Sequence, residues 1–79
     1  MRGEKIMHYW TLVGPAGEVA ICELVRGPHG LEVHCTVPDS DRVLRASGVK
    51  TEHDGFNVSE EWRAGYVSKG WQRHPEAGS

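Results

Sequence analysis

The segment Gly14-Pro15-Ala16-Gly17-Glu-Val-Ala-Ile-Cys22 recurs thirteen residues later as Gly27-Pro28-His29-Gly30-Leu-Glu-Val-His-Cys35, and this repeat decides the fold. Proline holds φ near about −65° in a tight turn, and glycine tolerates the dihedrals that hairpins require. Runs rich in β-branched and aromatic residues flank each turn, at 6–13, 18–26 and 31–37. The pattern predicts a three-stranded antiparallel meander over residues 5–37, ended by a proline.

The C-terminal third predicts a helix over residues 57–69. Asn57-Val-Ser-Glu60 resembles a capping box, with Asn57 as the N-cap and Glu60 reaching back to it. The helix is expected to end at Gly70, in a left-handed conformation that packs Trp71 against Tyr66. Apolar side chains at a spacing of four form one stripe for the sheet: Val58, Trp62 and Tyr66.

These segments predict a single small α+β domain over residues 1–71, with the helix packed on one face of the meander. The connection 38–56 is expected to be irregular, with two alternatives inside it. Residues 41–48 suit one or two helical turns, and residues 49–53 alternate like a short fourth strand. Residues 72–79 predict a flexible tail, in which Gly78-Ser79 is typical of a cloning scar.

Direct pairing of the residues that flank each turn predicts which side chains share a face. Cys22 is then opposite Tyr9 on one side and Cys35 on the other, on the face that the helix covers. The opposite face stays open and carries an apolar patch, which we expect to be an interface. A slip of one residue would exchange the two faces. The interface candidates are Trp10, Leu12, Val19 and Ile21.

Composition restricts the class of protein. The chain has 79 residues, a net charge of −2 and two cysteines, so it is too small for several domains and not basic like a typical nucleic-acid-binding domain. The local basic cluster Arg42, Arg45 and Lys50 makes nucleic-acid binding a weaker alternative. Without a signal-like or membrane-spanning stretch, we expect a cytoplasmic protein with reduced thiols and no membrane partner.

Two side-chain sets could carry chemistry. Cys22 and Cys35, directly opposed, lie within the distance range of a disulfide and could respond to redox state, although the pattern favours two small buried hydrophobes under the helix. His8, Glu23 and His34 form a row on the opposite face, a residue set that first-row metals accept. Motifs of hydrolases, nucleotide-binding loops and zinc proteases are missing, so we expect no enzyme, no catalytic residue and no cofactor.

The runs HYWTLVGPAGEVAICELVRGPHGLEVHC and SEEWRAGYVSKGW resemble short uncharacterised proteins of proteobacteria, over residues 7–71. That resemblance implies no activity and assigns no residue a role. The leading hypothesis is a small module that binds a protein partner or a second copy of itself through the open sheet face. The alternative is a metal- or redox-responsive binding protein.

Overall fold

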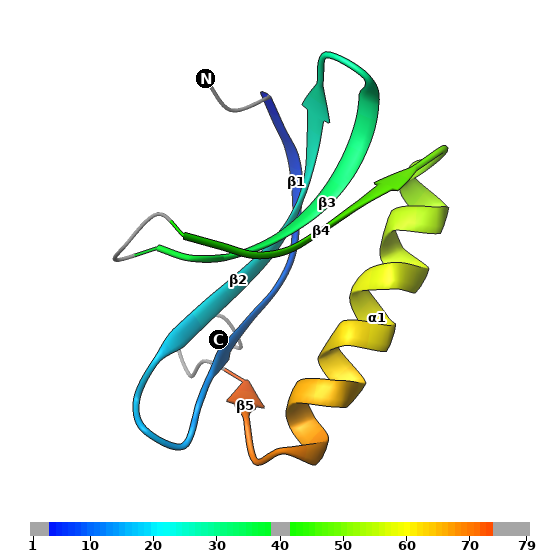
Figure 1. The fold of residues 1–79 in the computed structure, drawn as a ribbon. Helices are drawn as coiled ribbons and strands as arrows, with labels where there is room; N and C mark the ends of the chain where they lie inside the picture. The colour runs from blue at the N-terminus through cyan, green and yellow to red at the C-terminus, as the bar shows by residue number, and fades with distance from the viewer. Residues whose placement is uncertain (1–3, 39–41, 74–79) are drawn as a thin grey trace.

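The computed structural model describes residues 4–38 and 42–73, which form one antiparallel sheet and one helix (Figure 1). The sheet order is β4-β3-β2-β1-β5, and α1 follows the four-stranded meander. The expected α+β class is confirmed, with more strands than the sequence predicts. The elements are β1 Glu4–Val13, β2 Val19–Gly27, β3 Gly30–Val37, β4 Arg42–Val49, α1 Glu52–Ser68 and β5 Gln72–Arg73.

The second hairpin has the predicted register along its whole length. Gly27 pairs with Gly30 at the turn, and Cys22 lies opposite Cys35. Gly30 adopts a φ of 117°, a left-handed conformation in which glycine is favoured.

The first hairpin differs from the prediction by one residue near its turn. Glu18 belongs to the loop, because its carbonyl accepts from the Gly14 amide at 2.7 Å and its side chain accepts from the Ala16 amide at 2.9 Å. Val13 therefore pairs with Val19, and Trp10 replaces Tyr9 as the partner of Cys22. A bulge at Tyr9 restores the predicted pairing for His8–Glu23 and Met7–Leu24, and a second bulge at Ile6 shifts it again, so that Lys5 pairs with Val25.

The described part of the connection 38–56 is more regular than the sequence suggests. Residues 42–49 form the edge strand β4, so neither the helical turns over 41–48 nor the short strand over 49–53 is correct. The helix begins at Glu52, five residues before the predicted start. Its N-cap is Thr51, whose hydroxyl accepts a 3.0 Å hydrogen bond from the Asp54 amide.

The helix ends as predicted. Gly70 has a φ of 98°, its amide donates to the Val67 carbonyl, and the Trp71 amide donates to the Tyr66 carbonyl. These two bonds form a Schellman motif, and the rings of Tyr66 and Trp71 lie 5.0 Å apart. The reversal sends the chain back to the sheet, where β5 pairs with the end of β1. Gln72 and Arg73 thus belong to the sheet and not to a tail.

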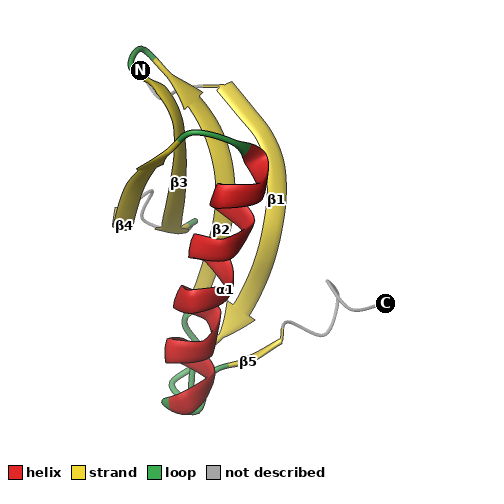
Figure 2. Ribbon diagram, turned by 90° about the vertical axis from the view of Figure 1, so that its right-hand side faces the viewer, coloured by secondary structure: helices red, strands yellow, loops and turns green. Residues whose placement is uncertain are grey.

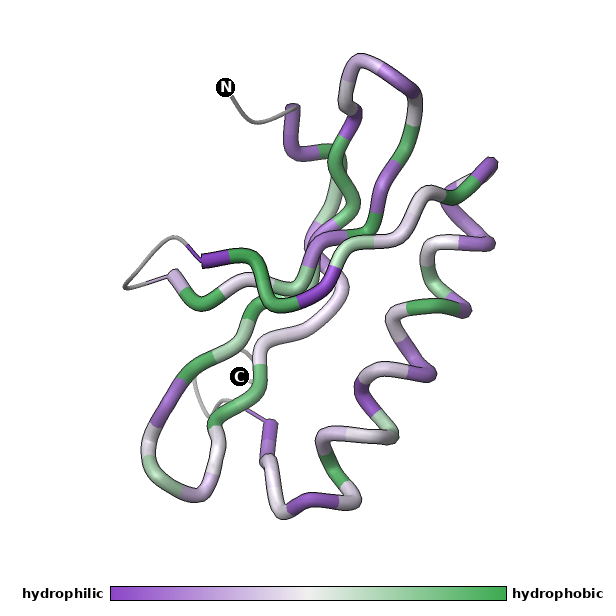
Figure 3. Tube along the Cα trace, viewed as in Figure 1, coloured by the Kyte–Doolittle hydropathy of each residue, from purple (hydrophilic) through white to green (hydrophobic). Residues whose placement is uncertain are grey.

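The core lies between α1 and the face of the sheet that it crosses (Figure 2). Apolar colour is concentrated on the strands, whereas α1 is mostly pale or hydrophilic with short apolar stretches (Figure 3). Val58, Trp62 and Tyr66 pack against the core as expected. Small residues on the same helix side bring the backbones together: a Cβ at Gly55 would meet the Tyr9 hydroxyl and the side chains of Leu24 and Val33.

Candidate functional site

The predicted apolar interface is not a single surface. Trp10 is 7% exposed and Leu12 is 2% exposed, because the changed register turns both toward α1 and into the core. Val19 and Ile21 stay on the open face and are half-buried. The expectation that these four side chains share an exposed patch is therefore wrong.

The row His8–Glu23–His34 exists in the backbone, but its side chains take separate partners. The Nε2 atom of His8 lies 2.7 Å from the Thr11 hydroxyl, and that of His34 lies 2.7 Å from a Glu32 oxygen. Glu23 lies 3.1 Å from the Lys5 ammonium. Over residues 4–38 and 42–73, no three His, Cys, Asp or Glu side chains come together as a metal site would require.

Cys22 and Cys35 are free thiols on adjacent strands, fully buried beneath the helix. Burial raises the pKa of Cys22, and the neighbouring Cys35 raises it further. Burial also raises the pKa of Cys35, opposed in part by its 3.8 Å hydrogen bond with Tyr66 and by the charge of Arg45. Protonated, inaccessible thiols are poor nucleophiles, so this environment favours a packing role.

One member of the basic cluster, Arg45, contributes to packing as well. The guanidinium of Arg45 lies 5.4 Å from the Tyr66 ring centre and 5.9 Å from that of Trp62. Such contacts are favourable cation–π geometry and hold the side chain against α1. Arg45 is therefore partly committed to the helix and not fully available for phosphates.

A hollow of about 380 Å³ separates β1 from the helix, and we call it the β1–α1 groove. On one side it follows the outer edge of β1, where β5 pairs only with Leu12 and Val13. Residues 4–11 have no strand partner on this edge within the described part of the chain. The groove is lined by His8, Tyr9, Trp10, Thr11, Leu12, Glu60, Arg63, Val67 and Arg73.

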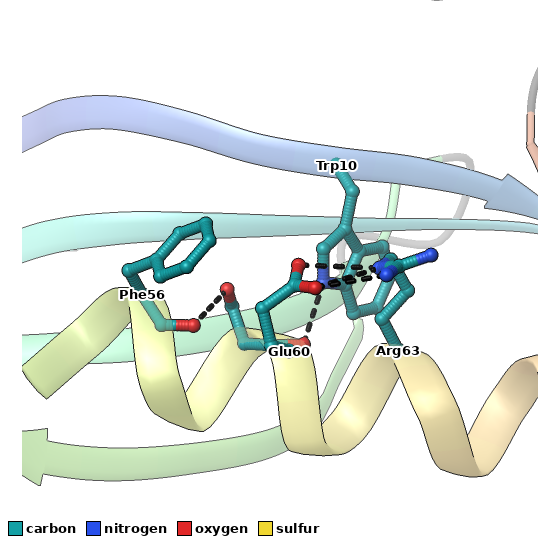
Figure 4. Close-up of polar contacts among 5 residues, drawn as sticks. Trp10, Phe56, Glu60 and Arg63 are labelled. Carbon is teal, nitrogen blue, oxygen red and sulfur yellow. Dashed lines mark hydrogen bonds and ion pairs between the residues drawn. The ribbon is translucent and has the colours of Figure 1, made fainter.

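Trp10 gives the groove a rigid inner wall. Its indole extends from β1 toward α1 and donates a 2.8 Å hydrogen bond to the Ser59 carbonyl, while the Ser59 hydroxyl donates to the Phe56 carbonyl at 2.7 Å (Figure 4). The indole also meets the Tyr66 ring edge-on at 5.9 Å. These contacts fix the distance between the strand and the helix.

The helix side of the groove carries the charged Glu60 and Arg63 and the apolar Val67, and Phe56 lies one helical turn before Glu60, outside the lining. Phe56 and Val67 are 48% and 46% exposed, which is unusual for large apolar residues on a small protein. Between them, Arg63 binds Glu60 through Nη2 at 2.8 Å and Nε at 3.1 Å (Figure 4). These hydrogen bonds hold the pKa of Glu60 below its usual range. Phe56 packs edge-on against Tyr9, at 6.3 Å between ring centres.

The groove is not predicted from the sequence. One signal is visible there: Glu60, Arg63 and Val67 recur at helical spacing, on a side of the helix other than the core stripe. The other element that borders the groove is β5, a two-residue strand with no sequence signature of its own.

No protein-family model, curated protein or solved structure matches this chain. The helix of the described residues lacks the length and apolar character needed to cross a bilayer.

Proposed function

We propose that this protein is a small interaction module that binds an extended segment of a partner protein, added as a strand to β1 in the β1–α1 groove. An edge strand next to a helix is a common site for this mode of recognition, since the backbone supplies hydrogen bonds and the groove supplies specificity. The proposal keeps the interaction role expected from the sequence and moves it from the open sheet face to the strand edge.

One observation carries the proposal. The chain itself adds β5 antiparallel to β1, through Leu12–Arg73 and Val13–Gln72. The outer edge of β1 thus accepts a strand, and the groove continues alongside residues 8–11. An unpaired strand edge offers its amides and carbonyls to any extended chain.

The bulge at Tyr9 limits the length of such a complex. A bulge disrupts the regular spacing of edge hydrogen bonds, so a partner can pair over only a short stretch near Trp10 and Thr11. Most of the affinity must then come from side chains in the groove. Val67, exposed on its helix side, is the apolar contact that we expect to matter most.

The test is an NMR titration of the isotope-labelled full chain with the neutral peptide Ser-Val-Thr-Gln-Thr-Val-Ser, blocked at both ends. We expect amide shifts at Trp10, Thr11 and Val67. Val67→Gln should weaken binding about tenfold or more, because it removes apolar contact area. Val43→Gln is the matched control, since Val43 is 43% exposed on β4, outside the groove.

Two results would overturn the proposal. Peptide shifts on the open face around Ile21 and Val43, with Val67→Gln unaffected, would return the interface to that face. No binding at millimolar peptide would reject strand addition. Sedimentation velocity tests whether a second copy of the chain occupies the groove instead of a partner segment. A dimer that dissociates in the Val67→Gln variant would show that it does.

A further inference from the structure

The β1–α1 groove is locally positive on a protein whose net charge is −2. Its lining contains two arginines, Arg63 and Arg73, against the single carboxylate of Glu60. Charge complementarity of this kind steers partners and selects among them.

The one carboxylate in the groove is already neutralised. Glu60 accepts from Nε and Nη2 of Arg63, and this side-on geometry uses one edge of the planar guanidinium. The fork of an arginine has five N–H donors, so Nη1 remains for a second acceptor. Within the described residues, no hydrogen bond engages Nη1.

Arg73 lies where an added strand would begin. It is the last residue of β5 and pairs with Leu12, whose side chain is buried on the α1 side of the sheet. Residues directly opposite each other in an antiparallel pair share a face, so the Arg73 side chain starts on the α1 side as well. Both arginines line the same hollow.

The spacing along the helix sets the pattern of a ligand. From Arg63 to Val67 the helix rises about 6 Å, since each residue adds about 1.5 Å. An extended segment covers this length with about two residues, at about 3.3 Å each, and every second side chain faces the helix. The helix therefore presents a charged and an apolar contact that match side chains two positions apart in the ligand: Arg63 and Val67.

We infer that the groove selects an extended acidic segment, with Asp or Glu at one position and an apolar residue two positions away from it. Arg63 and Arg73 bind the carboxylate, and the exposed side chain of Val67 contacts the apolar residue. This inference rests on the proposed strand addition, and it names the class of partner.

The test compares blocked peptides Ser-Val-Thr-Xaa-Thr-Val-Ser with Glu, Gln or Lys at the central position, titrated into the full chain. Glu should bind about tenfold tighter than Gln, because hydrogen bonds to a charged group are stronger than neutral ones. Lys should bind weakest, and the Glu preference should shrink as salt rises. Arg73→Gln should remove most of the preference for Glu, whereas Arg26→Gln, an exposed arginine of β2 outside the groove, should leave it unchanged.

The outcomes separate the two proposals. Equal binding of the Glu and Gln peptides at the groove would overturn the acidic preference and leave strand addition in place. No binding of any peptide would overturn both. The last comparison uses a chain shortened to end at Arg73. If the peptides bind only to this shortened chain, the protein's own C-terminal residues occupy the groove. That result would contradict the proposal that a partner segment binds there.

Discussion

The indole Nε1 of Trp10 donates a 2.8 Å hydrogen bond to the Ser59 carbonyl, and this bond joins β1 to the middle of α1. The Ser59 side chain is fully buried, so the two backbones approach closely at this point. A strand and a helix held at a fixed distance form a groove whose width does not depend on a ligand. Pre-organised sites of this kind lose less conformational entropy on binding.

Replacing the indole should cost stability in two steps. Trp10→Phe removes the hydrogen bond to a buried carbonyl and should lower the free energy of unfolding by about 1–3 kcal/mol. Trp10→Ala also opens a cavity and should cost about 3–5 kcal/mol. Urea unfolding followed by far-UV circular dichroism measures both. Trp62→Phe is the control, at a half-buried indole on the helix; an equal loss there would contradict a special role for Trp10.

Gly55 and Gly65 predict opposite effects of the same substitution. Alanine normally stabilises a helix interior by about 1 kcal/mol relative to glycine, and Gly65→Ala should do so because nothing lies within 4 Å of its added methyl. Gly55→Ala should destabilise, since the methyl collides with the Tyr9 hydroxyl and lies 3.2 Å from Leu24 and 3.3 Å from Val33.

A double variant identifies the cause at Gly55. Tyr9→Phe removes the hydroxyl and should recover part of the loss in Gly55→Ala, which a thermal unfolding series of the single and double variants detects. If the two substitutions are strictly additive, the collision with Tyr9 is not the reason.

The helix start can be tested with two alanine variants. Thr51→Ala should cost about 1 kcal/mol, because the hydroxyl that caps the Asp54 amide is lost. Asn57→Ala should be neutral or slightly stabilising, because Asn57 is exposed inside the helix and alanine has the higher helix propensity. Chemical denaturation of the two variants decides between them. The reverse order of stabilities would place the cap at Asn57.

The buried thiols predict a loss of stability in alkali. Burial raises the pKa of Cys22 above its ordinary value of 9.0, and that of Cys35 shifts in the same direction. Well below the ordinary thiol pKa both thiols are protonated in the folded and unfolded chain, so this contribution to stability is fully present. As pH rises further, only the unfolded chain releases these protons, and the free energy of unfolding falls by up to about 1.4 kcal/mol per pH unit for each thiol.

The measurement is the urea midpoint from pH 7.5 to pH 10 under reducing conditions. Cys22→Ala/Cys35→Ala should start less stable, because two buried side chains are truncated, but should decline less steeply. Burial raises the pKa of Tyr9 and Tyr66 too, so the comparison with the double variant isolates the share of the thiols. Identical slopes in both proteins would contradict the prediction.

The fold was predictable where local chemistry determines it. The Gly-Pro turns correctly predict two hairpins, and Gly70 followed by Trp71 correctly predicts the Schellman end of the helix. The predicted register of the first hairpin was wrong because a single side chain determines it. Glu18 joins the first loop through hydrogen bonds that no residue pattern reveals, and the bulge at Tyr9 then absorbs the shift.

The candidate site was less predictable for the same reason. A shift of one residue moved Trp10 and Leu12 from the expected open face into the core, and with them the expected interface. The helix began five residues early because Thr51 caps it, although Gly55 and Asn57 are poor helix formers. Tertiary contacts under α1 outweigh that low propensity, and a sequence window does not contain them.

The pairing of Leu12 with Arg73 also has a consequence for the order of assembly. The hairpins join neighbouring segments, so they can form as soon as each has been synthesised, whereas this pair connects the two ends of the described chain. During translation β1 is therefore among the first strands to form and the last to acquire its outer neighbour. Until then Leu12 and Val13 extend the open edge that residues 4–11 keep in the folded protein, and the bulges at Ile6 and Tyr9 shorten the regular stretch on which another nascent chain could pair.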